Sequence, residues 1–353
     1  MLTLDTYTFS SALPDSFTIE TDQDEDHVEV DIFLDGHSAY STRLYANSAG
    51  VCTFYELRSI VEQYMIAQNL TLAPFELMIS HENGGEQLED KHIIFSRHKH
   101  VNNDTLDFLE SHFLTGRPSY VMPRKSYGSI SFFATPEEYC TPFIDCVFER
   151  DGEIVSYRLN YSLYYHNVPY IYNISISPMS ISNMVIAAAE DYGKLLAFTV
   201  HAGHRSMTVY VVEEEPTILF SFRNSYNAQE SMPVFGTTTL KTEVSRKEAV
   251  SLNITSFYDK SVSRKWQVKT VPLSQEEAHW YNDFLESDCV TLNLSNDYPD
   301  LRILISDITS EISDSAKDLV HIKFSWRFDD NSIWLDEDRF PQVFSAPYND
   351  TFK

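Results

Sequence analysis

The amino-acid sequence predicts a mainly β protein built from tandem sandwich-like modules, each with one short capped α-helix. Two observations support this fold class. Aromatic residues make up 14% of the chain, while glycine occurs only 10 times in 353 residues; this balance favours half-buried strands over glycine-rich phosphate loops. Many segments also alternate apolar with polar residues, which is typical of a strand with one face in water.

The segment "HVEVDIFLDG" shows this alternation, because Val28, Val30 and Ile32 are separated by Glu29 and Asp31. In "SYRLNYSLYY", residues 156–165, tyrosine and leucine fall on one side of a predicted strand. Residues 195–212 predict a hairpin around an Ala-Gly turn. Further strands are expected in "SYGSISFFA", "PYIYNISI", "TILFSFRN", "TLKTEVSR", "KWQVKTV", "VTLNL", "LRILISDI" and "LVHIKFSWRF".

Helical patterns are few, and each lies between predicted strands. Two segments begin with a Ser/Thr-x-x-Glu capping box, in which the side chains at either end satisfy backbone N–H groups of the first turn. A serine cap and a following glycine mark a third segment. The predicted helices and caps are 54–69 (Thr53 with Glu56), 182–193 (Ser182 and Gly193), 275–287 (Ser274 with Glu277) and a less regular segment at 103–114.

The order of strands and helices predicts three β-rich parts that share one plan, with strands before and after a capped helix. The segments "TGRPSYVMPRKS" and "NAQESMPVFG" carry the turn residues expected at boundaries. The predicted parts are an N-terminal domain at 1–150 with its helix near 54–69, a middle module at 151–235, and a C-terminal sandwich-like module at 236–353 with its helix near 275–287.

The formal net charge of -26 limits the partners of the chain. A polyanion is repelled by nucleic-acid phosphates and by an anionic membrane surface, so neither is expected as a direct ligand. We also expect no membrane span, because no stretch approaches roughly 18 apolar residues, and no leader peptide, because the first residues lack a basic and an apolar region. Four cysteines lack metal-binding or disulfide-rich spacing and are expected to be ordinary buried thiols: Cys52, Cys140, Cys146 and Cys289.

Several histidine-containing patterns resemble parts of metal sites. Glu276 and His279 have the Glu-x-x-His spacing of di-metal helices, but that chemistry requires a four-helix bundle with further glutamates. We therefore expect Glu276, His279 and Asp283 to face water. The other patterns supply too few ligands, or fit a solvated loop or strand better: Glu89 with His92, the histidines His92, His98 and His100, and the pair His201 and His204.

An acidic segment before the first long strand partly resembles a calcium loop. Asp22, Asp24 and Asp26 occupy its first three ligand positions. However, His27 stands where glycine is needed, and Phe33 where a bidentate glutamate is needed. We therefore predict an acidic surface loop, and calcium binding there is left open. The acidic segment "DDNSIWLDEDRF" is likewise predicted to be an acidic surface segment, with calcium binding left open.

Motifs of nucleophilic catalysis are missing from the sequence. It contains no G-x-S-x-G, no phosphate-binding loop and no H-E-x-x-H. We predict no enzyme activity, no catalytic, cofactor-binding or metal-ligating residue, and no cofactor. A glycan hydrolase using two carboxylates is left open as an alternative among 52 acidic residues. Tryptophans also form carbohydrate-binding platforms. Trp280 and Trp326 are expected to pack in the core, so Trp266 and Trp334 remain as candidates for such a platform.

The segments "DGHSAYSTRLYANSAGVCTFYELRSIVEQYM" and "PLSQEEAHWYNDFLES", the latter with its flanking strands, resemble uncharacterised virion and tail-associated structural proteins of phages and prophages of Bacteroidetes. The likeness covers about half the chain and carries over no catalytic residue. It implies a β-sandwich-type module with one helix, as in tail tube, distal tail and baseplate proteins. Such modules assemble into a ring or tube with other virion components.

The resemblance and the composition together predict a non-enzymatic structural subunit of a phage tail, tail tip or baseplate. Its expected partners are copies of itself in a ring-like oligomer and other virion proteins, and its expected location is a virion assembled in the host cytoplasm. The acidity would help to keep free subunits soluble before assembly. The alternatives are a carbohydrate-binding or adhesin module and the glycan hydrolase named above.

Overall fold

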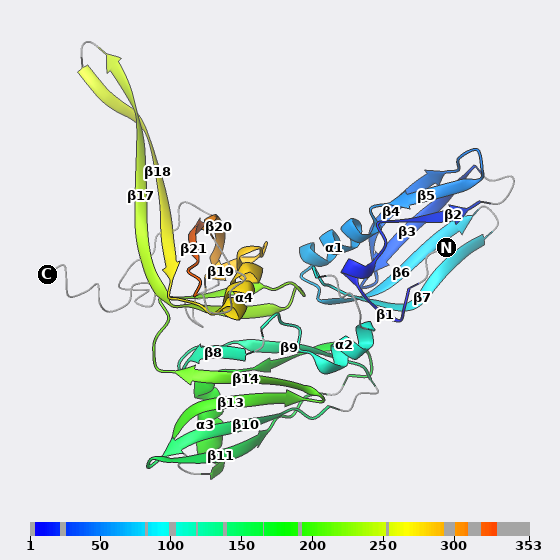
Figure 1. The fold of residues 1–353 in the computed structure, drawn as a ribbon. Coiled ribbons are helices and arrows are strands. Elements are labelled where there is room, and N and C mark those ends of the chain that lie inside the picture. Colours follow the sequence, from blue (N-terminus) through cyan, green and yellow to red (C-terminus); the bar gives the residue numbers. More distant parts are fainter. Residues whose placement is uncertain are drawn as a thin grey trace.

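A computed structural model describes residues 4–329 except 22–25, 82–83, 99–103, 118, 137–139, 165, 190–192, 252–253, 293–300 and 310–318. The described chain is mainly β with four α-helices, as the sequence predicts. Its strands form several sheets, which we group into an N-terminal unit (4–96), a middle unit (104–212) and a C-terminal unit (218–329) (Figure 1).

The N-terminal unit is a five-stranded sheet covered on one face. The sheet has the order β1-β7-β6-β3-β4, with β1 parallel to β7 and the other pairs antiparallel. The two-stranded sheet β2-β5 and helix α1 pack on its apolar face. The elements are β1 (Tyr7–Phe9), the 3-10 turn η1 (Ser10–Ala12), β2 (Ser16–Glu20), β3 (His27–Leu34), β4 (His37–Tyr45), β5 (Val51–Tyr55), α1 (Leu57–Ala67), β6 (Leu72–His81) and β7 (Gly84–Ile94).

The middle unit contains a second five-stranded sheet, β11-β10-β13-β14-β8, in which β8 runs parallel to β14, and a two-stranded sheet, β12-β9. Its core continues into that of the C-terminal unit. The elements are α2 (Thr105–Ser111), β8 (Ser119–Pro123), β9 (Ser129–Ala134), β10 (Phe143–Arg150), β11 (Glu153–Asn160), β12 (Tyr170–Ser175), α3 (Pro178–Ala189), β13 (Lys194–Ala202) and β14 (Arg205–Val212).

The C-terminal unit is a seven-stranded sheet of order β16-β15-β19-β20-β21-β18-β17, with helix α4 packed against it. Strands β17 and β18 have 16 and 17 residues, whereas the neighbouring strand β21 has six, and they extend far beyond the sheet (Figure 1, yellow-green). The elements are β15 (Ile218–Arg223), β16 (Gln229–Val234), β17 (Gly236–Ser251), β18 (Ile254–Thr270), α4 (Gln275–Leu285), β19 (Val290–Leu292), β20 (Leu301–Thr309) and β21 (Lys323–Phe328).

Strand pairing crosses both limits predicted near 150 and 235. Strands β8 and β9 lie before residue 150 but pair with β14 and β12 of the middle unit. Strand β15 lies before residue 235 but pairs with β19 of the C-terminal unit. These pairings join residues 36 or more positions apart in the sequence, so local turn residues do not reveal them.

The predicted caps have mixed outcomes. The box of Ser274 and Glu277 is present, and α4 begins immediately after it. The box predicted at Thr53 and Glu56 is wrong, because Thr53 is used in the pairing of β5 with β2 and Glu56 adopts a left-handed backbone with φ 65°. The cap predicted at Ser182 is also wrong, since α3 already begins at Pro178. Helix α2 confirms the fourth segment, with the side chain of Asp104 accepting from the N–H of Leu106.

The strands that were predicted from alternating apolar and polar residues agree better with the structure. Strand β3 has the predicted pattern, and β13 with β14 forms the predicted hairpin. The strand predicted at 156–165 ends at Asn160, as the end of β11. The structure has one long hairpin where the sequence suggested only separate short strands near 239–246 and 265–271.

Candidate functional site: an exposed basic hairpin

The hairpin formed by β17 and β18 is the feature that the cores do not explain. Its strands pair from Gly236 with Thr270 out to Ser251 with Ile254. Among the described residues, only the segment Trp266–Lys269 of β18 also pairs with β21, so most of the hairpin has no described strand along either edge. The pairing register shifts by one residue between Lys247 and Glu248, which marks a β-bulge.

Both faces of the hairpin are exposed. Side chains alternate between the two faces of a strand, yet every side chain from Thr239 to Glu248 is exposed. A two-stranded hairpin without a covered face is marginally stable at best in water. The outer part of this hairpin is therefore not stabilised by burial of either face against its own unit.

One face of the hairpin carries exposed apolar side chains together with two arginines. Leu240 and Val244 lie on this face, and Val262 lies directly across from Val244. Leu240 and Val244 are exposed and Val262 is partly exposed. Arg246 and Arg264 fall on the same face by the same alternation. We call this surface the stripe face.

The opposite face is polar and crowded with positive charge. Lys241 lies directly across from Lys265 there, an arrangement of like charges that destabilises a strand pair. Lys265 contacts Asp307 at 3.5 Å and Lys247 contacts Asp259 at 2.8 Å. Both ion pairs are solvent-exposed and so contribute little to stability.

The hairpin has the opposite charge from the rest of the protein. Residues 236–270 contain seven Lys and Arg against three Asp and Glu, whereas the rest of the chain contains 19 against 49. The first 100 residues alone contain 17 Asp and Glu against five Lys and Arg. A positively charged, uncovered projection thus extends from a strongly negative body.

The base of the hairpin is held firmly. The ring of Trp266 stacks on that of Trp326 at 4.4 Å between centroids, and both rings are buried. Gly236 has φ +154°, and a Cβ there would lie 2.1 Å from the carbonyl oxygen of Lys269. The hydroxyl of Thr217 also donates to the Gly236 carbonyl at 2.8 Å. The projection therefore starts from a rigid part of the core.

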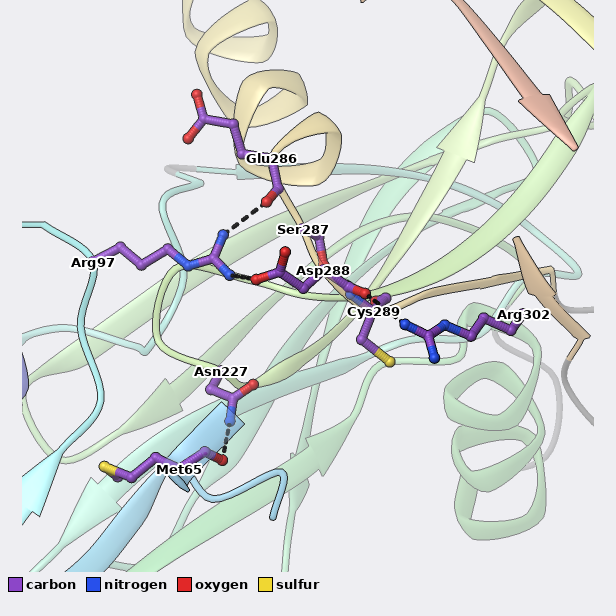
Figure 2. A network of polar contacts seen from close by, with 8 residues as sticks. All are labelled: Met65, Arg97, Asn227, Glu286, Ser287, Asp288, Cys289 and Arg302. Carbon is purple, nitrogen blue, oxygen red and sulfur yellow. Dashed lines mark hydrogen bonds and ion pairs between the residues drawn. The ribbon is translucent and has the colours of Figure 1, made fainter. Parts of the chain in front are cut away.

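Figure 2 shows how the N-terminal unit is joined to the C-terminal unit. The guanidinium of Arg97, which follows β7, donates to the Glu286 carbonyl at 2.8 Å and to the Asp288 carboxylate at 2.7 Å. The side-chain amide of Asn227 donates to the carbonyls of Met65 and Leu70 at 3.1 and 2.9 Å, and so completes the end of α1. These contacts link three distant parts of the chain.

A buried carboxylate connects the middle and C-terminal units. Glu230 accepts hydrogen bonds from the Tyr120 hydroxyl at 2.9 Å, the Trp280 indole at 2.8 Å and the Asn224 amide at 2.5 Å. The guanidinium of Arg117 lies 3.6 Å over the Trp280 ring. Burial, and secondarily the Glu230 charge, raises the pKa of Tyr120 well above its ordinary value. With three donors on Glu230, the cluster supports packing between units.

Asp283 corrects the expectation that it faces water. One of its carboxylate oxygens is buried without a hydrogen-bond partner. Burial, and then the nearby Glu230 carboxylate, raises its pKa to about 7. Glu276 and His279 on the same helix are exposed, as predicted. The local helix pattern did not reveal the burial because it comes from contacts with the 224–230 segment.

The other predicted candidates do not gather into a site in the described part of the chain. There, no three His, Cys, Asp or Glu side chains lie together as metal ligands. His201 pairs with Asp145 at 3.4 Å, while His204 is exposed in the turn. His92 belongs to β7, at a position paired with Tyr7 of β1. Outside the described residues or side chains lie Asp22, Asp24, Glu89, His100, Trp334 and the segment "DNSIWLDEDRF".

The remaining candidate residues are single side chains that are buried, exposed or paired with a neighbour in the sequence. Asp26 contacts His27 at 2.5 Å, and His98 is exposed. The predictions for Trp280 and Trp326 are confirmed, since both are buried, and Trp266 joins them. Cys52 and Cys146 are buried thiols, as predicted, whereas Cys140 and Cys289 are partly exposed. Burial raises the pKa of Cys146 to about 12, which disfavours its nucleophilic thiolate.

Comparison with known proteins does not assign a family to this chain. No protein-family model matches it, and no curated protein matches its sequence. Among the described residues, no helix has the length and apolar character needed to cross a membrane. The geometry and charge of the hairpin therefore carry the functional argument.

Proposed function

We propose that the protein is a non-enzymatic structural subunit of a phage virion, associated with the tail, tail tip or baseplate. It assembles with copies of itself, in a ring-like oligomer, and with other virion proteins, in particles formed in the host cytoplasm. The observation that carries the proposal is the β17–β18 hairpin, whose outer part is exposed on both faces.

The hairpin supports an assembly role for two physical reasons. Its free strand edges offer unpaired backbone groups that a neighbouring strand can extend. Its apolar side chains, including Leu240 and Val244, gain burial only when another molecule covers them. A projection that requires a neighbour for its own stability is typical of a subunit in an assembly.

The arrangement of the units supports the same proposal at a finer level. In the N-terminal unit, a core that includes Val30, Phe54 and Val61 fills the space between the five-stranded sheet and the β2-β5 pair with α1. Apolar packing of this kind between two sheets fits a sandwich-type module with one helix. We propose that all three units are modules of this type, used in tandem as building blocks of the particle.

The test compares the full chain with a shortened variant in which Asn-Gly replaces residues 242–264, leaving a two-residue hairpin turn. Analytical ultracentrifugation and negative-stain microscopy should show ring-shaped oligomers for the full chain and monomers for the shortened variant. Circular dichroism confirms that the shortened variant stays folded. A full chain that is monomeric at high concentration and absent from purified particles overturns the proposal.

The same preparation tests the two alternatives. Glycan-array binding that is independent of the hairpin would instead support a carbohydrate-binding module. Turnover on a panel of polysaccharides would support a hydrolase with paired carboxylates. Assembly through the hairpin without either activity is the expected result.

A further inference from the structure

We propose that the stripe face of the hairpin docks on the acidic outer face of the N-terminal sheet in a second copy of this chain. This inference rests on the proposed assembly role and names its partner and contact surface. The charges are the first argument, because the hairpin at 236–270 has seven basic residues against three acidic ones, and the body of another copy offers a strongly negative surface.

The receiving surface is the uncovered face of the five-stranded sheet. Asp31 of β3 and Glu76 of β6 lie on the face opposite the core, because their neighbours along each strand are buried. Glu29 of β3 lies on the same face and pairs with Arg43 of β4 at 2.6 Å. Phe33 and Met78 lie on the same face and are partly exposed. The register places Phe33 across from Glu76 and Asp31 across from Met78, so acidic and apolar side chains alternate there.

The two surfaces are complementary in chemistry. The stripe face has Leu240 and Val244 beside Arg246 and Arg264, and the receiving face has apolar side chains beside carboxylates. Arginine on carboxylate gives charge-assisted hydrogen bonds, and apolar side chains cover one another. The exposed part of the hairpin, about 13 residues long, extends roughly 40 Å, which is enough to cross a five-stranded sheet.

The geometry favours a neighbouring copy over the chain's own N-terminal unit and over nucleic acid. Figure 1 shows the hairpin projecting away from the N-terminal unit of the same chain. A nucleic acid would meet the basic hairpin but be repelled by the body, where 49 acidic residues face 19 basic ones. Because the two contact surfaces differ, the contact is head-to-tail, and such contacts close into rings when the rotation permits.

Two variants of the full chain separate the two halves of the contact. Arg246→Glu with Arg264→Glu alters the hairpin, and Asp31→Lys with Glu76→Lys alters the receiving face. Each variant should be monomeric in ultracentrifugation, with self-association more than about tenfold weaker than in the unaltered chain. An equimolar mixture should assemble again, because the unaltered hairpin meets the unaltered receiving face and the swapped charges of the other two surfaces also attract.

Two controls complete the design. Arg124→Glu with Arg150→Glu makes the same net-charge change at exposed ion pairs of the middle unit and should assemble as the unaltered chain does. The chain with all four contact substitutions should assemble again, because the swapped charges attract. Assembly of the unaltered chain should also weaken as salt increases.

The outcomes distinguish this inference from the proposed function. If the hairpin variant is monomeric while the receiving-face variant assembles normally, the hairpin binds elsewhere and the inference is overturned, although the assembly role stands. The inference is also overturned if the mixture of the two variants stays monomeric, or if hairpin-dependent binding to duplex DNA replaces self-association. An unaltered chain that never assembles overturns both.

Discussion

Two antiparallel hairpins of this protein, β3–β4 and β17–β18, are built from the same backbone pairing but differ in what covers them. In β3, Val28, Val30, Ile32 and Leu34 are fully buried, and the residues between them face water. In β17, no side chain from Thr239 to Glu248 is buried. The first hairpin is stabilised by its own unit, and the second extends beyond any core.

The difference shows that pairing alone does not decide what a strand contributes. Burial of one face stabilises β3 through the hydrophobic effect, roughly 25 cal/mol for each Å² of apolar surface removed from water. The outer part of β17 lacks this stabilisation by apolar burial and is held only by strand pairing and exposed ion pairs. Its sequence is therefore free to carry the charge and apolar side chains that suit a partner.

The largest expected effect separates the base of the long hairpin from its outer part. Trp266→Ala removes a buried ring stacked on Trp326 and should lower the free energy of unfolding by about 3–5 kcal/mol. Val244→Ala, at an exposed position on the same face four residues further out, should change it by less than about 0.5 kcal/mol. Urea unfolding of both variants measures this, and similar losses at the two positions would contradict the distinction.

The body and the outer hairpin should also differ in their response to pH. Asp283 of α4 has a native pKa of about 7, above its ordinary value of 3.8. Between these two values the native state holds a proton that the unfolded state releases. The free energy of unfolding should therefore fall as pH rises from about 4 to about 7, by a few kcal/mol, and level off above that range.

The pH response is tested with Asp283→Asn, which should remove most of this decline in urea unfolding measured at pH 5 and pH 8. The control is Glu276→Gln, at an exposed position of the same helix, which should leave the decline unchanged. If the free energy of unfolding still falls with pH in Asp283→Asn, other titratable groups cause the decline. The shortened-hairpin variant should keep the decline of the full chain.

A smaller effect is expected at the point where β17 leaves the body. Gly236→Ala places a Cβ against the Lys269 carbonyl in a backbone conformation with φ +154°, and should destabilise the protein by about 1–3 kcal/mol. Gly116→Ala is the matched control, because no heavy atom lies within 4 Å of the added group. Thermal unfolding compares the two, and equal midpoints would show that the base tolerates adjustment.

The smallest effect concerns α4, which follows the hairpin in the chain. Ser274→Ala removes the side chain that accepts from the Glu277 N–H and should lower stability by about 1 kcal/mol. If the hairpin is anchored independently of this cap, self-association should not change. Ultracentrifugation next to thermal unfolding measures both quantities on one sample, and a loss of association would show that the cap also positions the hairpin.

Sequence reasoning succeeded where local rules decide the structure. The alternation in β3 and the capping box at Ser274 follow from neighbouring residues, and both are confirmed. The box predicted at Thr53 failed because strand pairing with β2 engages that residue. The same local reading missed the burial of Asp283, which depends on a segment more than 50 residues away.

The long hairpin was missed for a related reason. Residues 247–264 show no single wet face, because neither face is covered by the chain itself, and period-2 alternation is the signal that identifies most strands. A charge count along the sequence would have singled out this segment, with its seven basic residues against three acidic ones at 236–270. What covers the hairpin depends on a second surface, which no local pattern encodes.

The β-bulge between Lys247 and Glu248 has a consequence for the outer end of the hairpin. Without it, Phe257 would point away from Val262, because the two residues are five positions apart along β18 and side chains alternate between the faces of a strand. The extra residue reverses that phase and sets Phe257 across from Glu248, on the side of Leu240 and Val244. One inserted residue thus keeps the apolar side chains in a single line past the point where the strand bends, and its deletion would break that line in two.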